Sequence, residues 1–330
     1  MPSTQSSPSS PSSPSSSSPA AAPPTPPAAD DRRPSLDRLA IALILACCAI
    51  WGANQVVMKV TLSVVPPLMQ GAIRSTIAAV LVGLWARHRG IALWPPDGIN
   101  PSGIVAGVLF ALEFCCLYGS VQYTSASRVI VFLYLAPFLV AAGMPLIAPG
   151  ERLRHAQIAG LALAFAALVF TFREGLASGG GDARTVWLGD LLALAAAALW
   201  GLTTLWIRAT PVGRAAPERT LFQQLAVSAP LMAIGSWLMG EPAPQWTSPI
   251  AIGSLFYQSV VIAFFSYLAW FWLLRHYPAA RVSAFTFLTP VLGLLAGVVL
   301  LDEQLTGSLL IGLAGVAVGL WLVNRPARSR

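Results

Sequence analysis

The sequence has few charged residues for its length. Asp, Glu, Lys and Arg together make up 10% of the 330 residues, whereas about 25% is usual for a soluble domain. Apolar residues reach 56% and the mean hydropathy is +0.69, so a soluble fold of this size could not cover its surface with polar groups. This composition excludes an ordinary soluble enzyme and a disordered chain, and it predicts an integral membrane protein. The net charge of +7 does not indicate a nucleic-acid partner, because the basic residues are scattered between apolar stretches.

The sequence also lacks the patterns that mark enzymes and metal sites. Its four cysteines form two adjacent pairs, and neighbours on a helix point about 100° apart, so neither pair makes a chelating face. The three histidines have no metal-ligand spacing, and the sequence contains no phosphate-binding loop or nucleophile motif. We therefore expect no metal, no cofactor and no enzymatic activity. An intramembrane enzyme and a membrane sensor or scaffold are the remote alternatives.

Long apolar runs dominate the rest of the chain. After a tail at residues 1–37, which is rich in Ser, Pro and Ala and is expected to be disordered, ten stretches are long enough to cross about 30 Å of hydrocarbon as helices. Their approximate limits are 39–58, 67–85, 102–122, 129–147, 156–172, 187–207, 221–239, 250–274, 282–301 and 305–323. Continuous runs of about 20 residues favour helices over barrel strands. The predicted fold class is an all-α membrane protein with ten transmembrane helices.

The basic residues predict the orientation of these spans. With the N-terminus in the cytoplasm, 15 of the 20 Lys and Arg residues fall in cytoplasmic segments and 4 in outer segments, while Arg74 lies within a span. Cytoplasmic loops of membrane proteins carry such an excess of Lys and Arg. We expect both termini in the cytoplasm. With one span fewer, every later loop would change sides and the excess of Lys and Arg in cytoplasmic segments would be lost.

The second half of the chain repeats the first at an offset of about 150 residues. Trp51-Gly52 recurs as Trp200-Gly201, and Ala136-Pro137 recurs as Thr289-Pro290. Each half holds five spans. Because five is odd, the second half enters the membrane upside down, and the predicted architecture is two inverted five-helix repeats. Inverted repeats of this kind are typical of transporters, whose substrate site lies near the midplane between the halves.

With these motifs in this order, the sequence resembles the drug/metabolite transporter superfamily, specifically its EamA-type members with ten helices. The residues that carry the resemblance are Trp51-Gly52-Ala53-Asn54, Arg74, the stretch from Tyr123 to Pro137, Gly150-Glu151, Gly189-Asp190, Trp200, Thr289-Pro290 and Asp302-Glu303. The resemblance covers nearly the whole chain after the tail. It implies EamA-like repeats at 38–174 and 185–324, a short cytoplasmic C-terminus at 325–330, and transport of small metabolites, amino acids or drug-like compounds, commonly as an exporter. It implies no particular substrate.

Two ionisable residues lie deep in predicted spans, Glu113 in the third and Arg74 in the second. A charge at a helix centre costs roughly 2.5–3.5 kcal/mol on insertion scales, so neither is expected on a lipid face. Glu113 is a candidate for binding a substrate amine or carrying a proton, and Arg74 for anchoring a carboxylate or phosphate. The alternative is a structural ion pair between the two, or an Arg74 that ties helices together or snorkels. Their repeat equivalents fall near Gln223, Gln224 and Ser266, so the predicted site is asymmetric.

Aromatic and amide side chains in the spans are further candidates for lining the cavity, since aromatic rings stack on substrates and buried amides are expensive in lipid. The candidates are Trp51, Asn54, Gln55, Tyr134, Trp200, Gln223, Tyr257, Tyr267 and Trp270. Interfacial belts are the alternative place for Trp and Tyr. Pro137 and Pro290 lie inside predicted spans and should bend them, either as hinges that open the cavity or as static kinks.

Taken together, these features predict a secondary transporter of small organic metabolites that works by alternating access. We expect proton-coupled efflux, and import or exchange by the same fold is the alternative. The expected partners are a small-molecule substrate, the lipid bilayer and protons as the coupling ion, with the chain as a monomer or homodimer. The expected location is the inner membrane of a bacterial cell.

Overall fold

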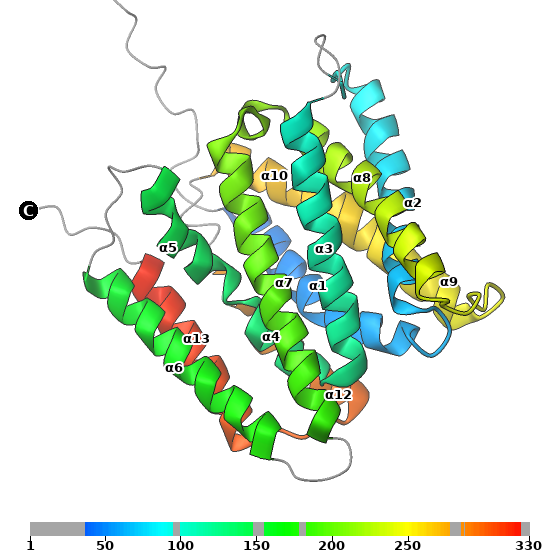
Figure 1. The fold of residues 1–330 in the computed structure, drawn as a ribbon. Coiled ribbons are helices and arrows are strands. Elements are labelled where there is room, and N and C mark those ends of the chain that lie inside the picture. The colour runs from blue at the N-terminus through cyan, green and yellow to red at the C-terminus, as the bar shows by residue number, and fades with distance from the viewer. Residues whose placement is uncertain are drawn as a thin grey trace, which may run out of the picture.

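The computed structural model describes residues 37–94, 100–147, 155–177, 183–277, 285–286 and 288–324. Every regular element within them is helical (Figure 1). The predicted tail, apart from Asp37, and the segment 325–330 lie outside the described residues, as does the Gly150-Glu151 motif.

The first repeat contains five helical segments, of which the fourth is broken in two. The helices are α1 (Arg38–Thr61), α2 (Pro67–His88), α3 (Pro101–Tyr123), α4 (Ala126–Leu133), α5 (Ala136–Ile147) and α6 (His155–Ala177). Together α4 and α5 occupy the fourth predicted span.

The second repeat also has five segments, and its third one changes helix type along its length. The elements are α7 (Ala183–Ala209), the short 3-10 helix η1 (Pro211–Arg214), α8 (Pro217–Leu238), α9 (Pro249–Phe256), the π-helix η2 (Tyr257–Ser266), α10 (Tyr267–His276), α12 (Leu288–Leu301) and α13 (Gly307–Asn324). The run α9–η2–α10 occupies the eighth predicted span.

Within the described residues, ten segments match the predicted spans. Seven are long and apolar enough to cross a membrane by length and composition, and three more are shorter apolar helices at Ile158–Thr171, Leu288–Leu301 and Gly307–Gly319. The chain is therefore a multi-pass membrane protein with the helix number that the sequence predicts.

Helices α2 and α8 occupy equivalent places in the two repeats. Each has 22 residues and begins with a proline, which suits the first helical position because its missing N–H would have no partner there. Each is followed by a glycine in the left-handed region, Gly90 with φ 67° and Gly240 with φ 66°. Residues that carry a side chain rarely adopt this backbone conformation, so a glycine ends both helices in the same way.

The contacts between these two helices show that the repeats are inverted. Gly71 near the start of α2 lies against Met232 near the end of α8, while Gly83 lies against Phe222. The two equivalent helices therefore run antiparallel. Helices α6 and α13 do the same, since Gly312 lies against Thr171 and Gly319 near the end of α13 lies against the start of α6.

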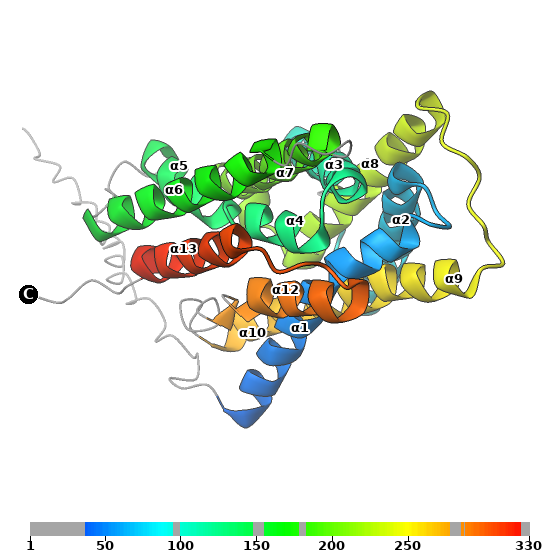
Figure 2. The same cartoon turned by 90° about the horizontal axis from the view of Figure 1, so that it is seen from below.

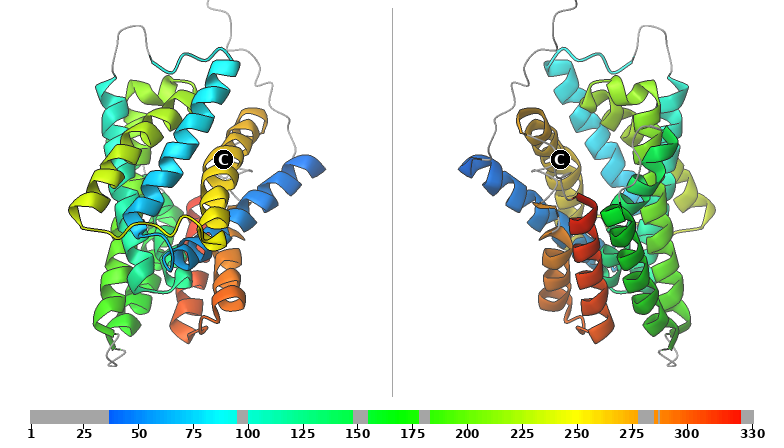
Figure 3. Two further views of the ribbon diagram at one scale, coloured as in Figure 1. Left: turned by 90° about the vertical axis from the view of Figure 1, so that its right-hand side faces the viewer. Right: turned by 90° about the vertical axis from the view of Figure 1, so that its left-hand side faces the viewer.

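The remaining helix pairs follow the same pseudo-symmetry. In the first repeat α3 packs on α7 and α8, and in the second η2 packs on α1 and α2. Likewise α5 packs on α7, and α12 packs on α1. Seen from below, α3, α6, α7 and α8 lie on one side, α1, α9, α10 and α12 on the other, and α2, α4 and α13 between them (Figure 2). Figure 3 shows that the start of α1 leans away from the rest of the bundle.

The two prolines that we expected to bend their spans occupy different places. Pro137 lies at the second residue of α5, and the helix is interrupted just before it, at Tyr134 and Leu135. Because proline has no N–H to donate to the carbonyl four residues back, and its ring crowds that carbonyl, α4 ends at Leu133. Pro290 lies in the first turn of α12, where a proline is tolerated, and residues 278–284 and 287 before it lie outside the described residues.

The π-helix η2 distinguishes the second repeat from the first, whose equivalent helix α3 is α-helical throughout. A π turn holds more residues than an α turn, because its hydrogen bonds reach one residue further. Ten residues of π-helix therefore complete roughly half a turn less than ten of α-helix. The segment turns the side chains of α10 toward a different neighbour than a continuous α-helix would.

Candidate functional site

Arg74 is the largest of the fully buried side chains, with 1% of its surface exposed. It lies in α2 with its guanidinium 4.2 Å above the centre of the Phe114 ring, and its Nη2 donates to the Tyr267 hydroxyl at 3.4 Å. Among the described residues, its Nε and Nη1 have no hydrogen-bond partner. A permanent cation with unused donors thus lies inside the bundle, stabilised in part by an aromatic face.

Glu113 is also buried and precedes Phe114 on α3. In the described part of the chain, Arg74 and Glu113 make no ion pair within 4.0 Å. The structural pair that the sequence left open is therefore not what holds these helices together. The two ionisable groups lie near each other but neither neutralises the other by direct contact.

Buried amides flank this centre on α1 and α2. Asn54 Nδ2 contacts Met58 Sδ at 3.3 Å, and Gln70 Nε2 donates to the Met58 carbonyl at 3.3 Å. Within the described residues, Asn54 Oδ1, Gln55 Oε1 and Gln70 Oε1 are buried without a donor. Our sequence analysis did not single out Gln70, although its place four residues before Arg74 puts it on the same helix face.

Helix α3 and the π-helix are joined by a hydrogen-bond chain beside Arg74. Tyr118 Oη donates to Gln258 Oε1 at 2.8 Å, and Gln258 Nε2 donates to Thr61 Oγ1 at 3.4 Å. Gln258 and Tyr267 are nine residues apart and would lie on opposite sides of a regular α-helix, because nine steps of about 100° end half a turn away. The π-helix lets Gln258 reach Tyr118 while Tyr267 reaches Arg74.

Three of the predicted aromatic residues connect α1 to this same span. Trp51 Nε1 donates to Ser266 Oγ at 2.8 Å, and the Trp51 and Trp270 rings meet edge to face with centroids 5.3 Å apart. Tyr257 Oη donates to the Ile50 carbonyl at 2.6 Å. These contacts hold α1 against η2 and α10, next to the polar centre.

The other predicted residues lie elsewhere in the bundle. Gln223 of α8 is buried against Gly103, about three turns along α3 from Phe114. Tyr134 is buried at the break between α4 and α5. Trp200 lies on α7 with 36% of its surface exposed. No hydrogen bond or ring contact between described residues connects these three side chains to Arg74.

A second polar cluster, which our sequence analysis missed, lies around the start of α4. Arg128 Nε donates to Asp190 Oδ1 of α7 at 3.0 Å, and Arg128 Nη2 also pairs with Asp190 Oδ2. Thr124 Oγ1 donates to Asp190 Oδ1 at 2.9 Å, and Arg128 Nη2 donates to the Thr171 carbonyl at 2.9 Å. This bidentate pair joins α4 of the first repeat to α7 of the second.

Two acids of the second repeat cap helices of the first. Glu303 accepts from the backbone N–H groups of Ala126 at 2.7 Å and Ser127 at 3.0 Å, and Lys59 lies 3.5 Å from the same carboxylate. Glu241 accepts in the same way from the N–H groups of Leu68 and Met69, both at 3.0 Å. A carboxylate at a helix N-terminus satisfies orphan donors and complements the helix dipole, so these contacts hold the two repeats together at one end of the bundle.

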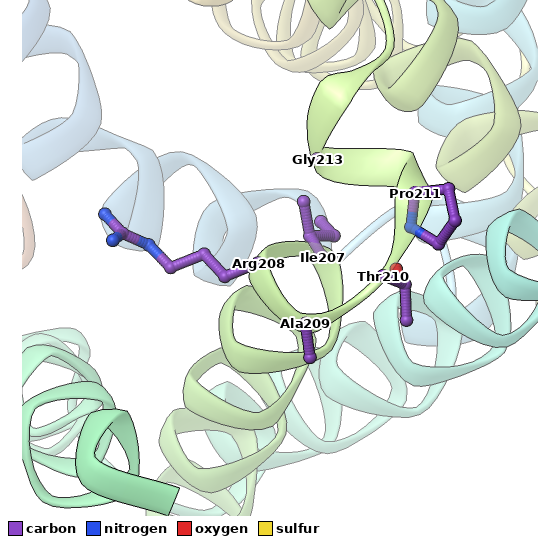
Figure 4. Close-up of a pocket in the computed structure, with 6 residues that line it drawn as sticks. All are labelled: Ile207, Arg208, Ala209, Thr210, Pro211 and Gly213. Carbon is purple, nitrogen blue, oxygen red and sulfur yellow. The ribbon is translucent and has the colours of Figure 1, made fainter. Parts of the chain in front are cut away.

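A cavity of about 620 Å³ lies at the end of α7 and η1. Its lining residues are Ile207, Arg208, Ala209, Thr210, Pro211 and Gly213 (Figure 4). The Arg208 side chain extends away from the others. None of the predicted site residues lines this cavity, and Arg208 is the one charged residue among those that do.

The polar centre combines charged, amide and aromatic side chains. Among the described residues, no group of three His, Cys, Asp or Glu side chains could hold a metal ion. What the centre contains is a cation, a nearby carboxyl group, unpartnered amide oxygens and aromatic faces. Such groups orient a polar organic molecule within an apolar bundle.

The two halves of the chain each match the same known family. The family described as the EamA-like transporter family matches residues 38–173 and again residues 187–325. This chain belongs to the EamA-like transporter family. The resemblance and the duplicated ten-helix fold predicted from the sequence are thereby confirmed, and the family is one of transporters, not of enzymes.

Several known proteins are similar over most of their length. An uncharacterised transporter of Bacillus subtilis, YvbV, is 29% identical over 305 residues, which cover 89% of this chain and 95% of that protein. A probable amino-acid metabolite efflux pump of Escherichia coli is 28% identical over 288 residues, covering 85% and 93%. A solved crystal structure with 20% identity has a TM-score of 0.59 and covers 86% of this chain and 96% of its own. That last likeness concerns the fold alone.

Proposed function

We propose that this EamA-like transporter exports amino-acid-like metabolites by alternating access around the polar centre at Arg74 and Glu113. The observation that carries the proposal is the buried guanidinium of Arg74, which has two N–H-bearing nitrogens without partners among the described residues. The name of the similar Escherichia coli protein, a probable amino-acid metabolite efflux pump, supports this substrate class.

The position of Arg74 in the fold supports this role. Arg74 lies on α2, which packs antiparallel on its repeat equivalent α8, so it is close to the pseudo-symmetry axis. Transporters with inverted repeats bind their substrate at this interface and rock the halves around it. The equivalent residue on α8 is Gln224, so only one side of the axis carries a charge.

Each group then has a separate task. Arg74 anchors a carboxylate through its fork of donors, and Glu113 carries the coupling proton. Trp51, Tyr257, Tyr267 and Trp270 form the aromatic wall against the substrate side chain. The repeats move at the break before Pro137 and at the start of α12, where Pro290 lies.

The surrounding residues and the topology complete the proposal. Asn54 and Gln55 face the same site from α1, and Gln223, Tyr134 and Trp200 line the route to it. The Lys and Arg bias of 15 to 4 supports an orientation with both termini in the cytoplasm, in the inner membrane of a bacterial cell. The capping acids Glu241 and Glu303 then lie at the outer end.

The test is electrogenic transport by purified protein in proteoliposomes on a solid-supported membrane. Amino acids, organic cations and sugars are applied under an inward and an outward proton gradient. We expect current with amino acids, its loss in Glu113→Gln, and its retention in Glu218→Gln, a control at the start of α8. Isotope counterflow is measured in parallel to detect electroneutral transport and to separate export from import and exchange.

Two results would contradict the proposal. If neither current nor counterflow is seen with amino acids, organic cations or sugars, the protein does not transport these substrates. Unchanged proton-driven flux in Glu113→Gln would remove Glu113 from coupling while leaving transport in place.

A further inference from the structure

The unpartnered amide and guanidinium atoms of the centre fall into two chemical kinds. On α1 and at the start of α2 they are acceptors, the amide oxygens of Asn54, Gln55 and Gln70. One turn further along α2 they are donors, the Nε and Nη1 of Arg74. The other unpartnered buried atoms among the described residues are the hydroxyls of Ser75, Ser259 and Thr289, which can donate or accept. Buried polar groups are almost always paired in native proteins, so a cluster of unpaired ones, sorted by kind, indicates what they bind.

The orientation of two of the amides leaves their oxygens as the available atoms. Asn54 and Gln70 approach Met58 from α1 and α2, and each directs its amide nitrogen at that residue, at 3.3 Å in both cases. Met58 and Gln70 are fully buried, and Asn54 is nearly so. Both oxygens are therefore left without a donor, on two helices whose amides meet at Met58.

The spacing between acceptors and donors is one helical turn. Gln70 and Arg74 are four residues apart on α2, which places their Cβ atoms roughly 5–6 Å from each other on one face. An α-amino acid carries its ammonium and carboxylate groups on the same carbon, so it can reach both side chains at once. Its ammonium group has three donors and no acceptor, while its carboxylate has only acceptors.

We propose that the site recognises zwitterionic α-amino acids, with the amide oxygens of Asn54 and Gln70 receiving the ammonium group while Arg74 receives the carboxylate. This inference rests on the proposed function and adds the residues that select the amine end. Gln70 is a specificity-determining residue in this scheme. Glu113 is left free to carry the proton, because the ammonium group is satisfied by uncharged acceptors.

Other small solutes match this arrangement less well. An organic cation without a carboxylate leaves the Arg74 donors unpaired and brings a second positive charge beside a buried one. A dicarboxylate places acceptor oxygens against the amide oxygens of Asn54 and Gln70. A sugar lacks the negative charge that would compensate the guanidinium.

The experiment uses three competitors that share one side chain. Phenylalanine, its deaminated analogue 3-phenylpropanoate and its decarboxylated analogue phenethylamine compete against counterflow of radiolabelled phenylalanine in proteoliposomes of the full-length protein. If another amino acid gives the largest signal in the panel above, its own deaminated and decarboxylated analogues are used. The variants are Gln70→Met, Gln70→Glu, Asn54→Leu and Arg74→Gln, with Gln122→Met at the exposed end of α3 as the control.

The expected pattern links each variant to one end of the substrate. Gln70→Met and Asn54→Leu should each raise the inhibitory concentration of the amino acid at least about tenfold, because each variant loses a hydrogen bond to the charged ammonium group. The inhibitory concentration of the deaminated acid, which has no ammonium group, should stay within about twofold. Gln70→Glu replaces the amide oxygen with carboxylate oxygens, so an acceptor for the ammonium group stays at this position and amino-acid binding should be retained. Arg74→Gln should weaken the amino acid and the deaminated acid but not the amine.

The outcomes separate this inference from the proposed function. If wild-type protein moves amino acids but Gln70→Met and Asn54→Leu weaken the amino acid and the deaminated acid equally, the assignment of the ammonium group is wrong and the transport proposal stands. Equal competition by all three compounds in the wild type overturns the zwitterion specificity. If the wild type moves no amino acid at all, the proposed function and this inference both fall. Size-exclusion profiles identify any variant that does not fold, and the other amide variant then decides.

Discussion

Replacing Asp190 with asparagine should destabilise the folded protein strongly. The carboxylate is fully buried and the Arg128 side chain is only 11% exposed, so water screens this ion pair little. Asparagine keeps the shape of the side chain and an oxygen that can accept from Thr124, but it removes the charge that compensates Arg128. The substitution therefore removes the buried carboxylate that pairs with the Arg128 guanidinium.

The expected size of the effect follows from this burial. Breaking a buried ion pair by removing one partner costs about 3–5 kcal/mol. In a protein of 150–250 residues, 1 kcal/mol shifts Tm by about 2–4 °C, so the loss for this chain should be on the order of 10 °C. Replacing both partners, as in Arg128→Met with Asp190→Leu, should recover much of that loss, because apolar residues leave no buried charge behind.

Thermal unfolding of the purified protein in detergent, followed by the fluorescence of its 11 tryptophans, measures this directly. Asp302→Asn is the matched control, because Asp302 is exposed and asparagine tolerates its positive φ of 52°. Asp302→Asn should unfold like the wild type. A Tm for Asp190→Asn within about 2 °C of that control would refute the reasoning, as would a double variant less stable than Asp190→Asn.

Three further predictions concern the contacts between helices. Glu303→Gln should lower the free energy of unfolding by about 1–2 kcal/mol, because a neutral amide caps the start of α4 more weakly than a carboxylate, and chemical denaturation with and without high salt should show it. Gly52→Ala should cost about 1–3 kcal/mol, since the added Cβ would lie 2.7 Å from the Gly293 nitrogen and force α1 away from α12, whereas Gly253→Ala, with no atom within 4 Å, should be neutral in the same melts. Pro137→Ala should allow α4 and α5 to join and should slow counterflow without lowering Tm; an unchanged transport rate would show that the break is a static feature.

Much of the fold could be predicted because membrane spans are encoded locally. A run of about 20 apolar residues has few structures available in lipid other than a helix, since its backbone groups must bond to each other. The break before Pro137 was also expected as a bend, because proline removes a hydrogen bond wherever it occurs in a helix. The π-helix at Tyr257–Ser266 was not predicted, because no residue type specifies a hydrogen-bond register that reaches one residue further.

The site was predicted only in part, for a related reason. Arg74 and Glu113 could be identified because an ionisable group in a span avoids lipid whatever the fold. Whether they form an ion pair depended on how α2 and α3 are rotated against each other, which the sequence does not show. The Arg128–Asp190 pair was missed because the two residues lie on different repeats and Arg128 falls one residue before the predicted span 129–147, whereas α4 begins at Ala126.

The sequence by itself determined the number of helices, their duplication and the inverted relation between the halves. Hydropathy, the odd number of spans per half and the basic residues of the loops can all be read along the chain without knowing which helices touch. Only the tertiary structure decided which polar groups meet. It brought Asn54 and Gln70 together at Met58, placed the Arg74 guanidinium over the ring of Phe114 and joined Asp190 to Arg128, because these encounters depend on helix rotation and packing distance. A shift of one residue turns a helix by about 100°, enough to exchange a binding residue for a lipid-facing one without changing the hydropathy of the span.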